Sequence, residues 1–516
     1  MRAIFGLVAA LSVTAISSCM FIRDFDELQS EGEDASAGSS GEGGSGAAGA
    51  HPGTGGSAGE AGGGGSTEDC ESDCDDDDPC TNDVCDGGVC RHYSAGAIAD
   101  GLSATAPDAD AQVLFLTGSP SGFYASVTSG NGADSAVALY SFDNEDSDLR
   151  VGPAVNDSRV LGGNALRAVP GARVALVAER ETPYLVHVFA ALTDASASSL
   201  PLEGDLANVW QLTLDSDLEP LEPAGVQRLS GLTPDYYVGQ LGPIAWPSGN
   251  VYHSAWIGEN RTAVYLRSKN TSLQRTLGDG STPVAAIAPL GDVDSNPGVI
   301  WLSAGQPARA YGQVVGLAGP SELSGCPDIA GDFYSTHSSE IRSGLWVASF
   351  TRLVHDGNEV TGVNTELQVL GCAAESPSCS VLVDDGGLDC TTQPMNGAYD
   401  LVTAILTRAN EPNIIYEAIL LPQYTTNVDE VTAYLQVVRA NLDGSGGNDA
   451  LFVGYGHEVA TVTGDPALWS PAVAFSGDEH LAAAWIEAGP SGAGEAHFER
   501  YRLCPFTDDD REHPAD

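Results

Sequence analysis

The sequence is poor in basic side chains and has almost no lysine. Among its 516 residues, 71 are Asp or Glu and 21 are Lys or Arg, and Lys269 is the single lysine. The resulting net charge of -50 argues against DNA or RNA as a partner, because phosphate binding needs clustered cations that release counterions. Aromatic residues are also scarce, at 7%, but 42% hydrophobic residues over this length can bury one large core or two modest ones.

The sequence also lacks an apolar run long enough for a membrane-spanning helix of about 20 residues. Its longest apolar stretch, Ala3 to Ile16, follows the basic start Met1-Arg2 and precedes the small residues Ser17 and Ser18. This is the layout of a secretory signal peptide, which must be left out of fold reasoning. We therefore predict that the protein is exported, with residues 1–19 as the signal segment.

The segment Ile16-Ser17-Ser18-Cys19 resembles the lipobox of bacterial lipoproteins. The resemblance implies that the Cys19 sulfur carries diacylglycerol, becomes the mature N-terminus and anchors the protein stably through several acyl chains. The alternative is an ordinary signal peptide with a chance cysteine near its end. Position 20 is Met, whereas the best-known inner-membrane retention signal has Asp there. This difference favours the outer membrane, on its periplasmic or cell-surface face.

Residues 20–67 are predicted to be a disordered tether. From Glu31 to Thr67 the chain is mostly Gly, Ala, Ser and Glu and contains no Val, Ile, Leu, Phe, Tyr or Trp, so nothing there can offset the entropy of ordering. A flexible piece of about 35 residues has a root-mean-square reach on the order of 30 Å. The tether would hold the rest of the protein clear of a lipid surface.

A cysteine-rich module is predicted at residues 68–93, and in an exported chain its density of sulfur indicates disulfides. Its cysteines are Cys70, Cys74, Cys80, Cys85 and Cys90. The run Asp78-Pro-Cys-Thr-Asn-Asp-Val-Cys85 resembles the short Cys-Thr-Asp-Cys repeats of slime-mould matrix proteins and myxobacterial surface proteins, which implies an extracellular setting. Zinc is the alternative, but the spacings contain no Cys-x-x-Cys pair, so we favour disulfides.

The cysteine count predicts a link between this module and the rest of the protein. Apart from Cys19, five cysteines lie in the module and five in the body, and both numbers are odd. Unless one thiol stays free in each set, a disulfide must join them. Cys372 and Cys379 are close enough in sequence to close a small loop, and the other pairings stay open. The five candidates in the body are Cys326, Cys372, Cys379, Cys390 and Cys504.

The body, residues 94–516, is predicted to be all-β with an acidic C-terminal tail. It consists of short runs rich in β-formers, such as Thr262 to Leu266, bounded by Gly, Pro, Asn and Asp. Two distant segments, 242–257 and 470–486, share a proline, a small apolar strand, a Ser-Gly-Asn/Asp turn and a second strand ending in Ala-Trp-Ile. The turn supplies the positive-φ residue of a tight hairpin.

A tryptophan period predicts how these strands are arranged. Trp256, Trp301 and Trp346 are 45 residues apart, the spacing of one four-stranded blade of a β-propeller. We therefore expect about seven blades, the last ending with the strand Phe498 to Leu503, and ring closure removes exposed sheet edges. Six or eight blades and a pair of β-sandwiches are the alternatives, but sandwiches do not explain the period. The predicted blades are 112–143, 162–214, 240–275, 283–316, 341–383, 399–440 and 469–503.

One segment of the body partly matches a calcium loop. Asp292, Asp294 and Asn296 place oxygens at alternate positions, as calcium requires. The following glycine is one position late and no Glu closes the loop, so a solvated hairpin turn is the favoured alternative. The run Asp75 to Asp78 in the module leaves the same two alternatives, a calcium site or solvated charge. Calcium is therefore a candidate cofactor, and none is firmly indicated.

No catalytic motif is complete in this sequence. His457-Glu458 does not continue to a second histidine, and Gly55 to Gly59 matches a nucleophile-elbow pattern inside the tether, where no strand precedes it. We therefore expect a surface-displayed binding or adhesion protein whose propeller meets a protein or polysaccharide. The alternative is a secreted carbohydrate-active hydrolase, because paired carboxylates leave no linear motif.

Overall fold

A computed structural model gives the structure of the protein and describes residues 74–505 with gaps, the longest of which are 196–205 and 380–401. The predicted signal segment, the lipobox with Cys19 and the tether lie outside the described residues, as do Cys70, Cys326 and Cys390. The described residues form strands and turns and contain no α-helix. Accordingly, no helix among them is long and apolar enough to cross a membrane.

Seven sheets follow one another along the chain, and we number them blades 1 to 7. Blade 1 contains β4 (Ala111–Ser119), β5 (Gly122–Ser129), β6 (Ala136–Asp143) and β7 (Arg150–Val151). Blade 2 contains β8 (Leu166–Ala168), β9 (Ala175–Ala178), β10 (Val186–Asp194), β11 (Leu206–Leu214), β12 (Pro220–Arg228) and β13 (Tyr236–Tyr237). Blade 3 contains β14 (Ile244–Ser248), β15 (Val251–Ile257), β16 (Val264–Ser268) and β17 (Arg275–Leu277).

Blade 4 contains β18 (Val284–Val293), β19 (Asn296–Ser303), β20 (Ala310–Val314) and β21 (Ser321–Glu322). Blade 5 contains β22 (Asp332–Arg342), β23 (Leu345–Asp356), β24 (Glu359–Ala373) and β25 (Ser376–Cys379). Blade 6 contains β26 (Val402–Thr407), β27 (Ile414–Tyr424), β28 (Glu430–Asn441), β29 (Leu451–Val453) and β30 (His457–Thr463). Blade 7 contains β31 (Ala472–Ser476), β32 (His480–Ala488), β33 (Gly494–Leu503) and, from the other end of the chain, β3 (Ala97–Thr105).

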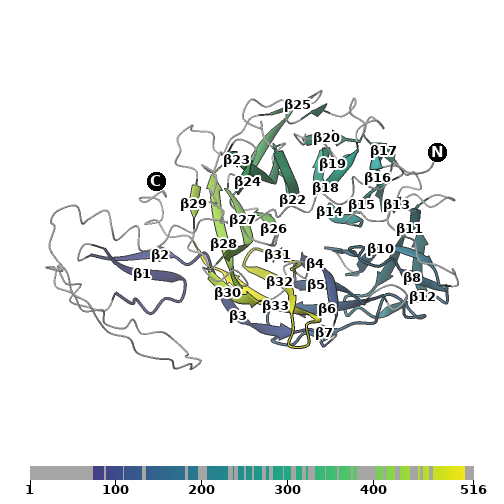
Figure 1. The fold of residues 1–516 in the computed structure, drawn as a ribbon, viewed down its shortest axis with the longest axis horizontal. Helices are drawn as coiled ribbons and strands as arrows, with labels where there is room; N and C mark the ends of the chain where they lie inside the picture. Colours follow the sequence, from purple (N-terminus) through teal and green to yellow (C-terminus); the bar gives the residue numbers. More distant parts are fainter. Residues whose placement is uncertain are drawn as a thin grey trace.

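The sheets form a closed ring, so the protein is a seven-bladed β-propeller (Figure 1). The inner strand of each blade contacts that of the next, in the order β4, β9, β14, β18, β22, β26 and β31, and β31 contacts β4 again. In blades 1, 3, 4 and 5, each strand pairs antiparallel with the next strand along the chain. The predicted fold class is confirmed, and this circular order excludes two stacked sandwiches.

Several predicted blade boundaries need correction. The predicted blades 1, 2 and 4 end too early, at residues 143, 214 and 316, because their sheets continue to β7, to β12 with β13, and to β21. The predicted blade 5 begins too late, at residue 341, because its first strand, β22, begins at Asp332. The seventh blade does not end with β33, because β3 pairs with it in the register Ala97↔Leu503 and takes the outermost position. Sheet closure is therefore made by a strand that precedes the first blade. The sixth blade continues beyond residue 440, since both β29 and β30 pair with β28.

The hairpin turn predicted from the repeated segment is present in blade 7. Gly477 has a φ of 57° between β31 and β32, a backbone conformation that glycine adopts without steric cost. In blade 3, Trp256 is completely buried and packs against Tyr265 and the neighbouring blade-2 core. Trp301 is likewise buried, stacked on Tyr311 in blade 4. The tryptophans thus fill the spaces between blades.

The seam where the ring closes is held by one buried cation. Arg500 on β33 is 3% exposed, and its guanidinium donates to the carbonyl oxygens of Asp100 on β3 (2.8 Å), Asp143 (2.7 Å) and Asp146 (2.9 Å). The last two acceptors belong to the end of blade 1. Arg500 therefore ties the closing strand, the last blade and the first blade together at one point.

Replacing Arg500 with Ala is expected to lower the free energy of unfolding by about 3 kcal/mol or more, because it leaves buried carbonyls without donors. Arg502→Ala is the matched control, since Arg502 lies two residues away on the same strand and is exposed. The Arg502→Ala control should lower the free energy of unfolding by less than about 0.5 kcal/mol. Urea denaturation of both variants measures the difference, and equal costs would contradict the role assigned to Arg500.

Candidate functional site

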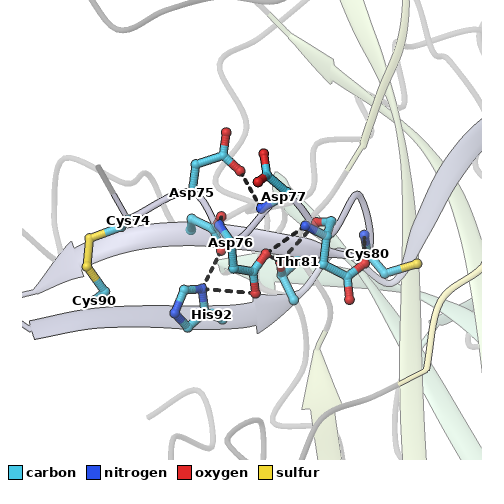
Figure 2. Close-up of polar contacts among 10 residues, drawn as sticks. Cys74, Asp75, Asp76, Asp77, Cys80, Thr81, Cys90 and His92 are labelled. Carbon is cyan, nitrogen blue, oxygen red and sulfur yellow. Dashed lines mark hydrogen bonds and ion pairs between the residues drawn. A yellow bond between two sulfur atoms is a disulfide. The ribbon is translucent and has the colours of Figure 1, made fainter. Parts of the chain in front are cut away.

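The cysteine-rich module forms a hairpin outside the ring of blades (Figure 1). Its strands are β1 (Thr81–Asp86) and β2 (Val89–Ser94), paired antiparallel with Asp83 opposite His92. A disulfide between Cys74 and Cys90 fastens the segment before β1 to β2 (Figure 2). We call this hairpin with its preceding segment, residues 74–94, the knot.

A second disulfide joins the knot to the propeller. Cys80, just before β1, is bonded to Cys504, just after β33, with Cα atoms 5.3 Å apart and a sequence separation of 424. The link that the odd cysteine counts predicted is therefore present. Next to it, the Cys504 amide donates to the Gly96 carbonyl, and the Ser94 hydroxyl donates to the Pro505 carbonyl.

The other candidate cysteines are placed less completely. Cys85 is disulfide-bonded. Cys372 lies on β24 and Cys379 on the adjacent β25, where the backbone partners are Cys372↔Pro377 and Leu370↔Cys379. Their side chains are not among those described, so the small loop predicted between them stays a prediction.

Loss of the Cys80–Cys504 link should destabilise the propeller by about 2–5 kcal/mol, because this disulfide closes almost the whole ring in the unfolded chain. The double variant Cys80→Ser with Cys504→Ser removes it. The control is Cys74→Ser with Cys90→Ser, which removes a disulfide of the same compartment that closes only a local loop. The denaturant midpoint of propeller unfolding should be lower in the Cys80→Ser, Cys504→Ser variant and unchanged in the Cys74→Ser, Cys90→Ser variant. An unchanged midpoint in both would show that the link adds nothing.

The side chains of Asp76, Asp83 and His92 converge on one point in the knot. Figure 2 labels two of them, Asp76 and His92. His92 Nδ1 lies 2.7 Å from Asp83 Oδ1 and 3.3 Å from Asp76 Oδ2, and ligand-type atoms of all three residues lie within 4.8 Å of one another. Asp83 is the least exposed, at 14% of its side chain, while His92 and Asp76 are about one-third exposed. One imidazole nitrogen and two carboxylate oxygens therefore face a common space that solvent can enter.

Each carboxylate is oriented by bonds to its second oxygen. The Asp76 amide donates to Asp83 Oδ2 at 2.9 Å. Asp76 Oδ1 in turn accepts from the Asp78 amide at 2.9 Å and from the Thr81 hydroxyl at 2.8 Å. The segment that carries Asp76 turns sharply here, with Asp77 at a φ of 59°.

The environment keeps Asp83 ionised. Partial burial opposes its ionisation, but hydrogen bonds from His92, the Asp76 amide and Thr81 outweigh burial and hold the pKa of Asp83 below its ordinary value. Chemically, the three groups can form a hydrogen-bonded ion pair or hold a divalent cation through one nitrogen and two oxygens.

Sequence reasoning found part of this cluster. Asp76 lay within the Asp75 to Asp78 run considered for calcium, whereas Asp83 and His92 were not assigned a role. The signal that could have found them is the hairpin register, which puts these two residues opposite each other. The other predicted cation ligands fall at the β18–β19 turn: Asp292 and Asn296 are on the flanking strands, Asp294 lies outside the described residues, and no side-chain geometry is described for the set.

A buried polar cluster connects blades 2 and 3. His187 Nε2 lies 2.9 Å from Glu179 Oε1, and the same carboxylate forms an ion pair with Lys269. On the far side of the imidazole, Gln211 bonds His187 Nδ1 and the Tyr252 hydroxyl of blade 3. A hollow, partly open to solvent, lies beside Glu179 between blades 1 and 2.

The charges in this cluster are already compensated. Burial lowers the pKa of His187 below its ordinary value, although the neighbouring Glu179 opposes this shift. Burial raises the pKa of Glu179, but hydrogen bonds from Lys269 and His187 outweigh it and leave that pKa low. At neutral pH the cluster is thus a Lys269–Glu179 ion pair beside a neutral imidazole, which suits a cross-link between blades.

Stability should fall as the pH drops through about 6.5, since the unfolded chain protonates His187 near that ordinary value while the folded chain keeps it neutral. The His187→Gln variant lacks this contribution. It should therefore lose less stability than the natural protein between pH 7.5 and 5.5, as measured by urea unfolding at each pH. Parallel pH profiles for the two proteins would contradict the assignment.

The inner strands, which line the centre of the ring, carry little charge. Five of the seven contain no Asp, Glu, His, Lys or Arg. These five are β4, β9, β14, β26 and β31. Only β18 and β22 bring ionisable residues to the inner position, and their charged side chains are not among those described.

Comparison with known proteins identifies no family. No protein-family model matches the chain, and no curated protein matches it. Solved structures similar to it include a sialidase from Trypanosoma rangeli, with a TM-score of 0.36, 9% identity and coverage of 82% of this chain and 57% of the sialidase. A protein of unknown function from Dyadobacter fermentans has a TM-score of 0.38, 8% identity and coverage of 82% and 100%. Similarity at this level carries no argument about activity.

Proposed function

We propose that this protein is a lipid-anchored binding protein displayed on the cell surface, with the propeller as a rigid platform for a protein or polysaccharide ligand. The anchor is the lipid on Cys19, and the predicted tether, residues 20–67, is the spacer. The knot connects this spacer to the propeller. The main support is the Cys80–Cys504 disulfide, because it joins the knot, where the chain arrives from the anchor, to the end of the last blade.

This connection matters for a protein held at its N-terminus. A pull on the spacer reaches the knot first and then both β3, which closes the ring, and Cys504, which follows its last strand. Without the disulfide, the same pull would act on β3 alone and peel the outermost strand from blade 7. The disulfide would therefore keep β3 paired in blade 7 when a bound ligand and the fixed anchor pull in opposite directions.

The low charge of most inner strands favours a platform over a hydrolase. Glycoside hydrolysis commonly uses paired carboxylates beside the substrate, and among the seven inner strands only β18 and β22 carry Asp or Glu. The hollow beside Glu179 has room for only about one water molecule. Its carboxylate is already paired with Lys269. The connecting loops, where binding residues are commonly placed, are the expected ligand surface.

The anchor is tested by Cys19→Ser, which should move the protein from the membrane fraction to the soluble fraction and abolish labelling by fatty-acid analogues. Ser18→Ala is the control, since Ala is also a small residue and should preserve attachment. Continued membrane association of the Cys19→Ser protein would refute lipidation.

Binding is tested on the same preparations with arrays of glycans and matrix proteins. We expect saturable retention of an array component with no release of reducing sugar or peptide over time. Release of product that saturates with substrate would contradict the platform and favour the hydrolase.

A further inference from the structure

We propose that Asp76, Asp83 and His92 form a binding site for one divalent transition-metal cation of the zinc class. The ligand atoms are Asp76 Oδ2, Asp83 Oδ1 and His92 Nδ1, which the fold of the knot brings together from the segment before β1 and from both strands of the hairpin. The inference does not depend on the proposed surface display.

The distances suit a small cation. With bonds of about 2.1 Å, the separations of 2.7 and 3.3 Å from His92 Nδ1 to the two oxygens correspond to angles at the cation of about 80° and about 104°. These angles bracket the 90° of an octahedral arrangement and approach the tetrahedral value. The partial exposure of Asp76 and His92 leaves room for water at the remaining positions.

The oxygens are positioned before any cation arrives. Asp83 and Asp76 each accept hydrogen bonds on the oxygen that faces away from His92, as described above. Outer bonds of this kind fix the orientation of metal-binding carboxylates, and their loss commonly weakens metal affinity 10–100-fold. The arrangement therefore has both the ligand atoms and the contacts that orient them.

The imidazole determines which class of cation fits. Calcium prefers six to eight oxygens and gains little from nitrogen, whereas zinc and its neighbours bind imidazole and carboxylate together. Thiolate does not compete at this place, because Cys74, Cys80 and Cys90 are all in disulfides. The favoured occupant is thus a cation bound by one nitrogen and two oxygens, in contrast to the calcium considered for Asp75 to Asp78 from sequence.

A cation held here would add a third connection within the knot. The Cys74–Cys90 disulfide already fixes the start of the segment to β2, and the cation would fix its middle, at Asp76, to β1 and β2. The site lies a few residues from Cys80, the point of attachment to the propeller. Metal binding should therefore stiffen the path from the spacer to the propeller.

The test is a titration of the full-length protein, purified in detergent without a histidine tag, with Zn²⁺ by calorimetry and with Co²⁺ by visible absorption. We expect one saturable equivalent that about 100-fold excess Ca²⁺ does not displace. His92→Gln and Asp83→Asn should each weaken Zn²⁺ binding at least tenfold. Asp77→Asn and His480→Gln serve as controls, since they make the same chemical changes outside the three ligands, and they should bind as the natural protein does.

Peptide mapping without reduction verifies that the Cys74–Cys90 and Cys80–Cys504 disulfides survive in each variant, so that lost binding is not lost folding. The proposal is overturned if no saturable equivalent is found, which would leave a hydrogen-bonded ion pair. It is equally overturned if binding persists in both ligand variants, or if Ca²⁺ binds as well as Zn²⁺ and His92→Gln has no effect.

Discussion

The pairing of β3 with β33 is the interaction on which the rest of this structure depends. A propeller has no central helix or cofactor to hold it together, so its stability requires that the last blade meet the first without a gap. Here the chain uses a strand from before blade 1 to complete blade 7. Arg500 then joins that strand and the turn of blade 1 through three backbone carbonyls.

The Cys80–Cys504 disulfide reinforces this closure covalently. The bond fastens the end of β33 to the knot, and next to it the Cys504 amide donates to the carbonyl of Gly96, the residue that precedes β3. Its position also explains why so small a hairpin is attached to so large a body: the knot carries Cys80 to the seam. Under the proposed function, the knot would serve both the attachment to the anchor and the closure of the ring.

The fold class and the number of blades could be predicted from sequence, because several blades repeat local signals. Trp256 and Trp301 fill equivalent spaces between blades, and the Gly477 turn recurs as a pattern, so period and turn chemistry together located the blades. The closing strand gave no such signal. β3 reads Ala-Ile-Ala-Asp-Gly-Leu-Ser-Ala-Thr, with weak β-formers and a register shift around Gly101, and its place is decided by the free edge of β33.

The candidate site could be predicted only in part for a related reason. The odd cysteine counts predicted a link between module and body, unless one thiol stayed free in each, but could not select Cys80 and Cys504. That pairing depends on which sulfurs the closed ring brings together. The run Asp75 to Asp78, which contains Asp76, stands out in the sequence as four consecutive acidic residues. Its partners Asp83 and His92 are nine residues apart, and only the hairpin register places them opposite each other.

The most direct test of closure is disulfide mapping of the purified full-length protein, with free thiols blocked before proteolysis and no reducing agent present. The account predicts one cross-linked peptide pair that contains Cys80 and Cys504, in nearly all molecules. A protein in which Cys80 is paired within the knot, or in which Cys504 is recovered as a blocked thiol, would contradict it.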